Sequence, residues 1–162
     1  MEDYIIRLIE PKDNASLAKI IRSALEEFNA NKPGTVYFDA STDHLFELFS
    51  TTPNAVYFVA ESNGILLGGA GIYPTEGLPE GVCELVKMYL HQNARGKGLG
   101  GLLISTCLKE AAKMGYRKVY LETMPELQKA VTVYEKFGFK YLNAPIGHSG
   151  HTGCNIWMMK SI

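Results

Sequence analysis

The stretch Arg95-Gly96-Lys97-Gly98-Leu99-Gly100-Gly101 joins a strand-like segment, residues 83–90, to a long helix-like segment. Four of its seven residues are glycines, which allow tight turns and expose bare N–H groups. The first amides of the helix that follows have no intrahelical acceptor and carry partial positive charge, to which the arginine and the lysine add full charges. The stretch therefore predicts a binding site for a phosphate-bearing ligand.

The glycine spacing fits more than one kind of phosphate site. Gly96, Gly98 and Gly101 match the G-x-G-x-x-G of dinucleotide-binding folds, and Glu122 lies where a ribose-binding acid could stand. The stretch lies past mid-chain, however, and only one βα repeat follows it, which is unusual for a dinucleotide fold. A Walker A loop is excluded because no Gly-Lys pair precedes Ser or Thr.

Composition indicates one ordinary globular domain, residues 1–162. Apolar residues make up 46% of the chain, and 16 basic against 17 acidic residues leave a net charge of −1, so we expect neither nucleic acid nor a membrane as a partner. The start, Met1 to Tyr4, lacks the basic flank of a signal peptide, and no apolar run is long enough for a membrane span. Three widely spaced cysteines suit reduced thiols, so we expect a cytoplasmic protein.

Hydrophobic periodicity predicts eleven elements in the order β-α-α-β-β-β-α-β-α-β-β. Helical spacing extends from about residue 15, and again over residues 45–49, 99–114 and 125–137. Strand-like segments lie between and around them, at residues 4–9, 55–61, 65–73, 83–90, 118–123, 139–142 and 155–160. This order predicts an α/β (α+β) fold with a mixed, mainly antiparallel sheet and helices on both faces.

Three motifs resemble those of one enzyme family. Read as Arg95-x-x-Gly98-x-Gly100, the glycine stretch resembles the acetyl-CoA pyrophosphate loop of the GNAT superfamily of N-acetyltransferases, Gln/Arg-x-x-Gly-x-Gly/Ala. Glu84-Leu-Val-Lys-Met-Tyr-Leu90 resembles the family's splayed fourth strand, and Tyr134-Glu-Lys-Phe-Gly-Phe139 resembles the end of its last major helix. These matches follow the family's order over roughly residues 82–142, and the family has the element order predicted above.

The resemblance implies acetyl-CoA as cosubstrate, with its pantetheine arm between the fourth and fifth strands. One main-chain N–H of the fourth strand would hold the thioester oxygen as charge builds on it, and Gln128 lies near where the family places a polar contact to pantetheine. The implied cofactor-binding residues on the strand and the loop are Met88, Tyr89, Leu90, Arg95, Gly96, Lys97, Gly98, Leu99, Gly100 and Gly101.

The resemblance also implies two catalytic side chains, each with a simpler alternative. Tyr134 stands where the family often has a tyrosine that protonates the departing sulfur, although its place on an apolar helical stripe also suits a packed side chain. Glu84 stands where some members carry a general base that acts directly or through water, although a strand glutamate can equally lie on the surface.

Two segments are candidates for the acceptor side of the site. His148-Ser-Gly-His151-Thr-Gly-Cys154 has zinc-ligand residue types at spacing three, but it has only three ligands in a glycine-rich setting, so we predict no metal site. In the family this segment borders the acceptor cleft, where His148 or His151 could assist proton removal. Aromatics with one acid could enclose a cationic amine or simply pack on the sheet: Phe28, Tyr37, Phe38 and Asp39.

We therefore expect an acetyl-CoA-dependent N-acetyltransferase that acylates a primary amine of a small molecule or peptide directly, in a ternary complex. A non-catalytic acyl-CoA-binding or sensing module and a nicotinamide oxidoreductase are the alternatives. A homodimer is the commonest default for the assembly.

Overall fold

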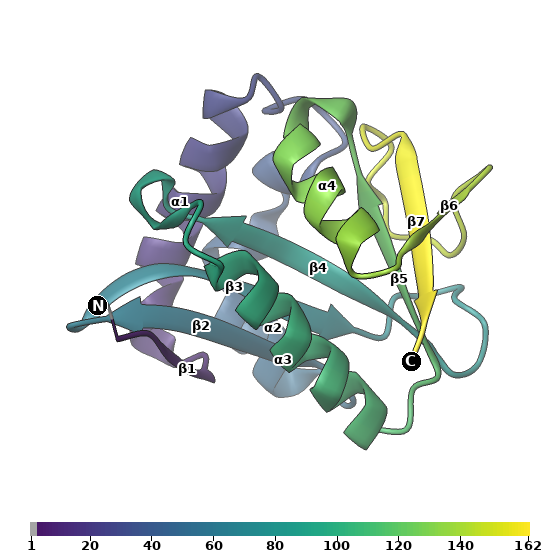
Figure 1. Ribbon diagram of the computed structural model, residues 1–162, viewed down its shortest axis with the longest axis horizontal. Coiled ribbons are helices and arrows are strands. Elements are labelled where there is room, and N and C mark those ends of the chain that lie inside the picture. Colours follow the sequence, from purple (N-terminus) through teal and green to yellow (C-terminus); the bar gives the residue numbers. More distant parts are fainter. Residues whose placement is uncertain (1–2) are drawn as a thin grey trace.

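The computed structural model describes residues 3–162, whose seven strands form one sheet (Figure 1). The start of the predicted domain, Met1 and Glu2, lies outside the described residues. The strands are β1 (Ile5–Leu8), β2 (Val56–Ser62), β3 (Ile65–Tyr73), β4 (Val82–Leu90), β5 (Lys118–Thr123), β6 (Lys140–Leu142) and β7 (Ile156–Ser161). The α-helices are α1 (Asn14–Glu27), α2 (Leu45–Thr51), α3 (Leu99–Lys113) and α4 (Gln128–Lys136). The predicted order of elements is confirmed.

The sheet is mixed and mainly antiparallel, as predicted. Its strand order is β1-β2-β3-β4-β5-β7-β6, and among the described residues only the β4–β5 pair is parallel. The hairpin between β2 and β3 turns at Asn63 and Gly64, which both have positive φ, as an Asn-Gly turn of type I′ requires.

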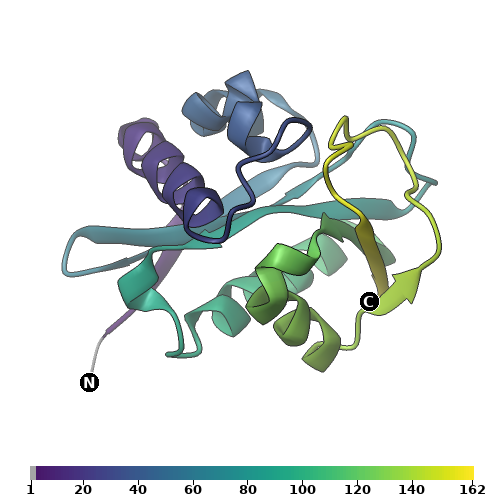
Figure 2. The ribbon, with the colours of Figure 1, turned by 90° about the horizontal axis from the view of Figure 1, so that it is seen from above.

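Helices cover both faces of the sheet (Figure 2). On one face, α1 and α2 cover a core in which Leu17, Ile21 and Leu25 of α1 are fully buried. On the other face, α3 and α4 cover a second core that includes Leu103 and Tyr134. Within residues 3–162, no helix combines the length and the apolar character needed to cross a bilayer.

The sheet opens between β4 and β5. The two strands pair only from Val82 to Glu84 on β4, and Glu84 is the last partner, opposite Tyr120. Beyond that point β4 stays with β3 and β5 stays with β7, so their facing edges diverge. A bulge at Lys87, whose φ is +52°, bends β4 further, and the Tyr57 hydroxyl donates a 2.8 Å hydrogen bond to the Lys87 carbonyl.

Candidate active site

A pocket of about 340 Å³ lies at the opening between β4 and β5. Its walls come from both strands, the glycine stretch, the first turn of α3, α4 and the segment before β7. This size suits a small-molecule or cofactor site, and a divergence of two neighbouring strands exposes main-chain groups that an extended ligand can pair with.

The glycine stretch forms part of the wall of this pocket. Gly96 and Gly98 have φ of +75° and +80°, values that residues other than glycine rarely adopt. Gly98 is also the N-cap of α3. Gly100 lies in the first turn of α3, where an added Cβ would lie 3.4 Å from the Met88 side chain. Lys97 is exposed outside the pocket, and Leu99 is buried in the core. The other five predicted loop residues line the pocket: Arg95, Gly96, Gly98, Gly100 and Gly101.

Arg95 is held by the protein at the edge of the pocket. Its guanidinium donates to the Glu27 carboxylate and, over 3.1 Å, to the Leu90 carbonyl, and it lies 4.9 Å from the centre of the Phe28 ring. These contacts tie α1 to the end of β4. The predicted pyrophosphate contact of Arg95 stays a prediction, and Arg95 has a structural task as well.

Of the residues predicted to contact pantetheine, those on β4 line the pocket and the one on α4 does not. Met88, Tyr89 and Leu90 line it along the free edge of β4. Gln128 is exposed and donates a 3.4 Å hydrogen bond to Thr132 on its own helix, while its neighbours Leu127 and Lys129 line the pocket. The position of Gln128 therefore lends its predicted contact no support.

Tyr134 reaches the pocket from α4 and is also part of the core. The residue is 7% exposed, and its ring packs edge-on against Phe139 with the ring centres 5.9 Å apart. Burial raises the pKa of its hydroxyl above the ordinary value, so the group is protonated at neutral pH. Tyr134 is thus a packed tyrosine that also lines the pocket, and its role as proton donor to the departing sulfur stays a prediction.

Glu84 is buried rather than on the surface, so the simpler alternative for it was wrong. It is 3% exposed at the last β4–β5 pair, where the Thr75 hydroxyl donates a 2.5 Å hydrogen bond to its carboxylate. Burial raises the pKa of Glu84 to about 7; the Thr75 hydrogen bond opposes this rise, and the nearby charge of Glu122 adds to it.

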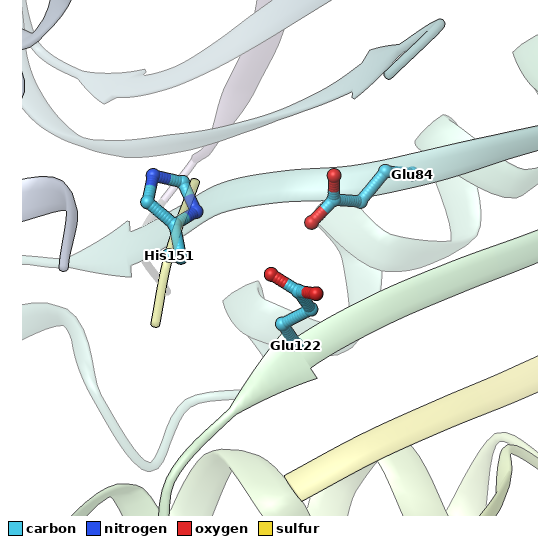
Figure 3. Close-up of side chains that lie close together, drawn as sticks. All are labelled: Glu84, Glu122 and His151. Carbon is cyan, nitrogen blue, oxygen red and sulfur yellow. The ribbon is translucent and has the colours of Figure 1, made fainter. Parts of the chain in front are cut away.

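Glu122 and His151 complete a cluster with Glu84 that sequence reasoning missed (Figure 3). The carboxylates of Glu84, from β4, and Glu122, from β5, point toward each other, and His151 lies beside them (Figure 3). Tyr120 donates a 2.7 Å hydrogen bond to one oxygen of Glu122, and the Ser149 hydroxyl donates to the other. The sequence linked Glu122 only to the dinucleotide alternative, because its place depends on where β4 and β5 part.

A second charged group lies next to this cluster. The Nε2 atom of His151 lies 2.7 Å from an Asp39 carboxylate oxygen, and the Lys87 ammonium lies 3.9 Å from the same oxygen. Burial opposes ionisation of Asp39, but the His151 hydrogen bond and the nearby charge of Lys87 lower its pKa. Burial also lowers the pKa of Lys87, whose side chain is 7% exposed and lines the pocket.

Only some of the other residues predicted for the acceptor side line the pocket. Phe28 lines the pocket, but Phe38 is 61% exposed, and the Tyr37 hydroxyl donates to Glu26 over 3.0 Å on the surface of α1. Of the two histidines, His151 lines the pocket, whereas His148 packs against Gly77 in a neighbouring loop. The acceptor side therefore carries more charge and fewer aromatic rings than we expected.

The cluster of Glu84, Glu122 and His151 also has the composition of a cation site. One ligand atom from each residue lies within 4.8 Å of the others, and two carboxylates with an imidazole can hold a divalent ion. This set differs from the His148–Cys154 set weighed from the sequence. Hydrogen bonds within the protein already occupy these carboxylates in part: Thr75 donates to one oxygen of Glu84, and Tyr120 and Ser149 donate to the two oxygens of Glu122.

Known proteins resemble this chain in sequence and in fold. Residues 19–139, which include the splayed strand and the glycine-rich start of α3, match the family model described as "Acetyltransferase (GNAT) family", so the class of protein is an acetyltransferase. The chain is 35% identical to the uncharacterized N-acetyltransferase YjgM of Escherichia coli K12, over 98% of this chain and 95% of that protein. The chain belongs to the GNAT family of acetyltransferases.

Solved structures of low sequence identity share the fold. A GNAT-family acetyltransferase from Staphylococcus aureus superposes with a TM-score of 0.86 at 16% identity, over 98% of this chain and 99% of that one. The PaiA N-acetyltransferase of Thermoplasma acidophilum, solved in complex with coenzyme A, superposes with a TM-score of 0.77 at 18% identity, over 99% of each chain.

Proposed function

We propose that residues 1–162 form a single acetyltransferase domain that transfers the acetyl group of acetyl-CoA directly to a primary amine of a small molecule or peptide. The observation that carries the proposal is the meeting of the Glu84 and Glu122 carboxylates where β4 and β5 part, in the pocket that Tyr134 also lines. A proton acceptor and a proton donor thus flank one slot. A cytoplasmic location and a homodimer stay predictions of the sequence.

The donor would enter along the glycine stretch and β4. Its pyrophosphate would be held by the first amides of α3, which follow Gly98, and its pantetheine arm would pair with the main chain of Met88 to Leu90. One N–H of that segment would donate to the thioester oxygen as negative charge develops there. The PaiA complex with coenzyme A supports this placement by similarity of fold.

Amine acylation needs a base, which we assign to Glu84 with Glu122 beside it. A primary amine has a pKa of about 10.4 and is mostly protonated at neutral pH, so a proton must leave before nitrogen can attack. With a pKa of about 7, Glu84 can accept that proton directly or through water. The amine nitrogen then bonds to the acetyl carbonyl carbon, and the C–S bond breaks. The second proton of the nitrogen passes, directly or through water, to the leaving thiolate, to which Tyr134 donates a hydrogen bond.

A covalent acetyl-cysteine route has little support. Cys83 is fully buried, and burial raises the pKa of its thiol to about 12. Cys154 lines the pocket, but burial also raises the pKa of its thiol to about 12, so very little nucleophilic thiolate forms at neutral pH. Direct transfer in a ternary complex remains the mechanism that these residues suit.

The competing functions predict different results in one assay. The wild-type protein would be incubated with acetyl-CoA and a panel of amines, polyamines, amino acids and peptides, and release of CoA thiol would be followed. We expect turnover with at least one class of amine. Binding of CoA with no turnover across the panel would favour a non-catalytic sensing module, and the GNAT family match already argues against the nicotinamide alternative.

A further inference from the structure

Thr123, the last residue of β5, has a hydroxyl with no hydrogen-bond partner in the described part of the chain. Among residues 3–162, it is the one buried side-chain oxygen or nitrogen without a hydrogen bond, and the residue is 3% exposed. A buried hydroxyl without a partner destabilises a folded protein, because it has lost its bonds to water and gained nothing in return. Such a group in a native structure calls for an explanation.

The residue that carries this hydroxyl belongs to the wall of the pocket. Thr123 is one of the residues that line it, as are Glu122 before it and Met124 after it. The Asn155 N–H donates a 3.1 Å hydrogen bond to the Thr123 carbonyl, so the end of β5 is fixed against the chain that leads into β7. The unpartnered side chain is thus presented from a rigid strand end.

Strand alternation shows which side of the sheet Thr123 faces. Successive side chains point to opposite faces, so Thr123 shares a face with Leu121 and not with Glu122. Leu121 packs in the same core as Tyr134, on the face that α3 and α4 cover (Figure 2). Thr123 therefore faces the side of Tyr134, whereas Glu122 faces Glu84 and His151.

We infer that the Thr123 hydroxyl is a hydrogen-bonding group for the acyl-pantetheine arm of acyl-CoA, an assignment that rests on the proposed function. The arm carries two amides and a thioester, so it offers carbonyl oxygens along its length to a donor in a narrow slot. The main chain of β4 pairs with one edge of the arm, and the Thr123 hydroxyl donates a hydrogen bond to the arm from the β5 side. The amine acceptor is a less suitable ligand for the Thr123 hydroxyl, because the carboxylates of Glu84 and Glu122, which would receive the acceptor's proton, lie on the opposite face of the sheet.

The test compares two Thr→Val variants that differ in whether the lost hydroxyl has a partner. Thr123→Val keeps the side-chain shape and removes the unpartnered hydroxyl. Thr42→Val is the matched control: Thr42 is fully buried outside the pocket, and its hydroxyl donates a 2.7 Å hydrogen bond to the Val36 carbonyl. Each protein is measured for Tm without ligand and for its Kd for CoA by calorimetry, and Thr123→Ser tests rescue.

The two variants should show opposite patterns. Thr123→Val should keep or raise the Tm and weaken CoA binding about 3- to 10-fold, the worth of one hydrogen bond. Thr42→Val should lower the Tm and leave the Kd for CoA unchanged, and Thr123→Ser should bind CoA within about twofold of the wild type.

The outcomes separate this inference from the proposed function. Failure of the wild type to bind CoA would overturn the proposed function and the inference together. Wild-type binding with an unchanged Kd in Thr123→Val would overturn the inference alone. A fall in Tm as large as that of Thr42→Val would also overturn it, because the hydroxyl would then have a structural partner.

Discussion

Burial affects Tyr134 and Glu84 in the same direction but with opposite chemical results. It raises the pKa of both groups, which makes Glu84 a stronger base and Tyr134 a weaker acid. A free thiol has a pKa of about 8.5, so full proton transfer from Tyr134 to a thiolate is uphill. Tyr134 is therefore better suited to donate a hydrogen bond as the sulfur leaves.

Tyr134→Phe should lower kcat about 100-fold, at the small end of the range for general acids, with little change in the Kd for CoA. Steady-state kinetics and CoA calorimetry check this pair of results. Tyr116→Phe is the control, because its hydroxyl donates to the Asn54 carbonyl over 2.8 Å outside the pocket, and it should leave kcat unchanged. An unchanged kcat in Tyr134→Phe, with acetyl transfer rate-limiting, would leave Tyr134 only its packing role.

Individual site residues differed in how far the sequence could predict them. Glu84 and Tyr134 stand in motifs of the family, so their positions were predictable, but the burial of Glu84 was not. Glu122 and His151 lie beside Glu84, and Lys87 lies near Asp39, because the fold brings β4, β5 and the segment before β7 together. Such juxtapositions depend on register and strand geometry, which local sequence patterns do not encode.

At the level of elements, the junction of β4 and α3 links fold to donor binding. Gly98 ends the turn in a left-handed conformation, and α3 starts directly after it, so one residue sets the direction of the first free amides. The sequence predicted this element pair well, because a glycine run between a strand and an amphipathic helix is a strong local signal. It could not predict that Arg95 also ties α1 to β4 through Glu27 and Leu90.

Gly98→Ala should weaken CoA binding at least about tenfold, because alanine resists the left-handed conformation by about 1–2 kcal/mol and the helix amides would turn away. Gly115→Ala is a matched control: both glycines have positive φ, and an added Cβ would meet nothing within 4 Å at either. We expect similar losses of stability in the two variants, and a loss of CoA affinity in Gly98→Ala alone. Equal CoA affinities would contradict the pyrophosphate role of the stretch.

At the scale of the whole molecule, the site is a gap in an otherwise continuous sheet. The described strands are hydrogen-bonded from β1 to β6, yet β4 and β5 pair at only three positions. A ligand that pairs with the free edges would supply contacts that the two strands do not make with each other. Stability should therefore depend on the donor.

Acetyl-CoA at 100 times its Kd should stabilise the fold by about 2.7 kcal/mol, which corresponds to a rise in Tm of roughly 5–11 °C for a chain of this size. A thermal melt with acetyl-CoA and a parallel melt with NADH check the prediction, and NADH should have no effect. Stabilisation by NADH instead would restore the dinucleotide interpretation of the glycine stretch.

The proposed use of Glu84 as a base can be tested most directly by the pH dependence of kcat/KM for the best acceptor in the amine panel. A base must be ionised to accept a proton, so kcat/KM should rise with pH and bend near Glu84's pKa of about 7. Glu84→Gln should lose about 100-fold or more in kcat/KM at neutral pH, together with the bend, while it still binds CoA. A Glu84→Gln enzyme with a wild-type rate and a wild-type pH profile would contradict the account.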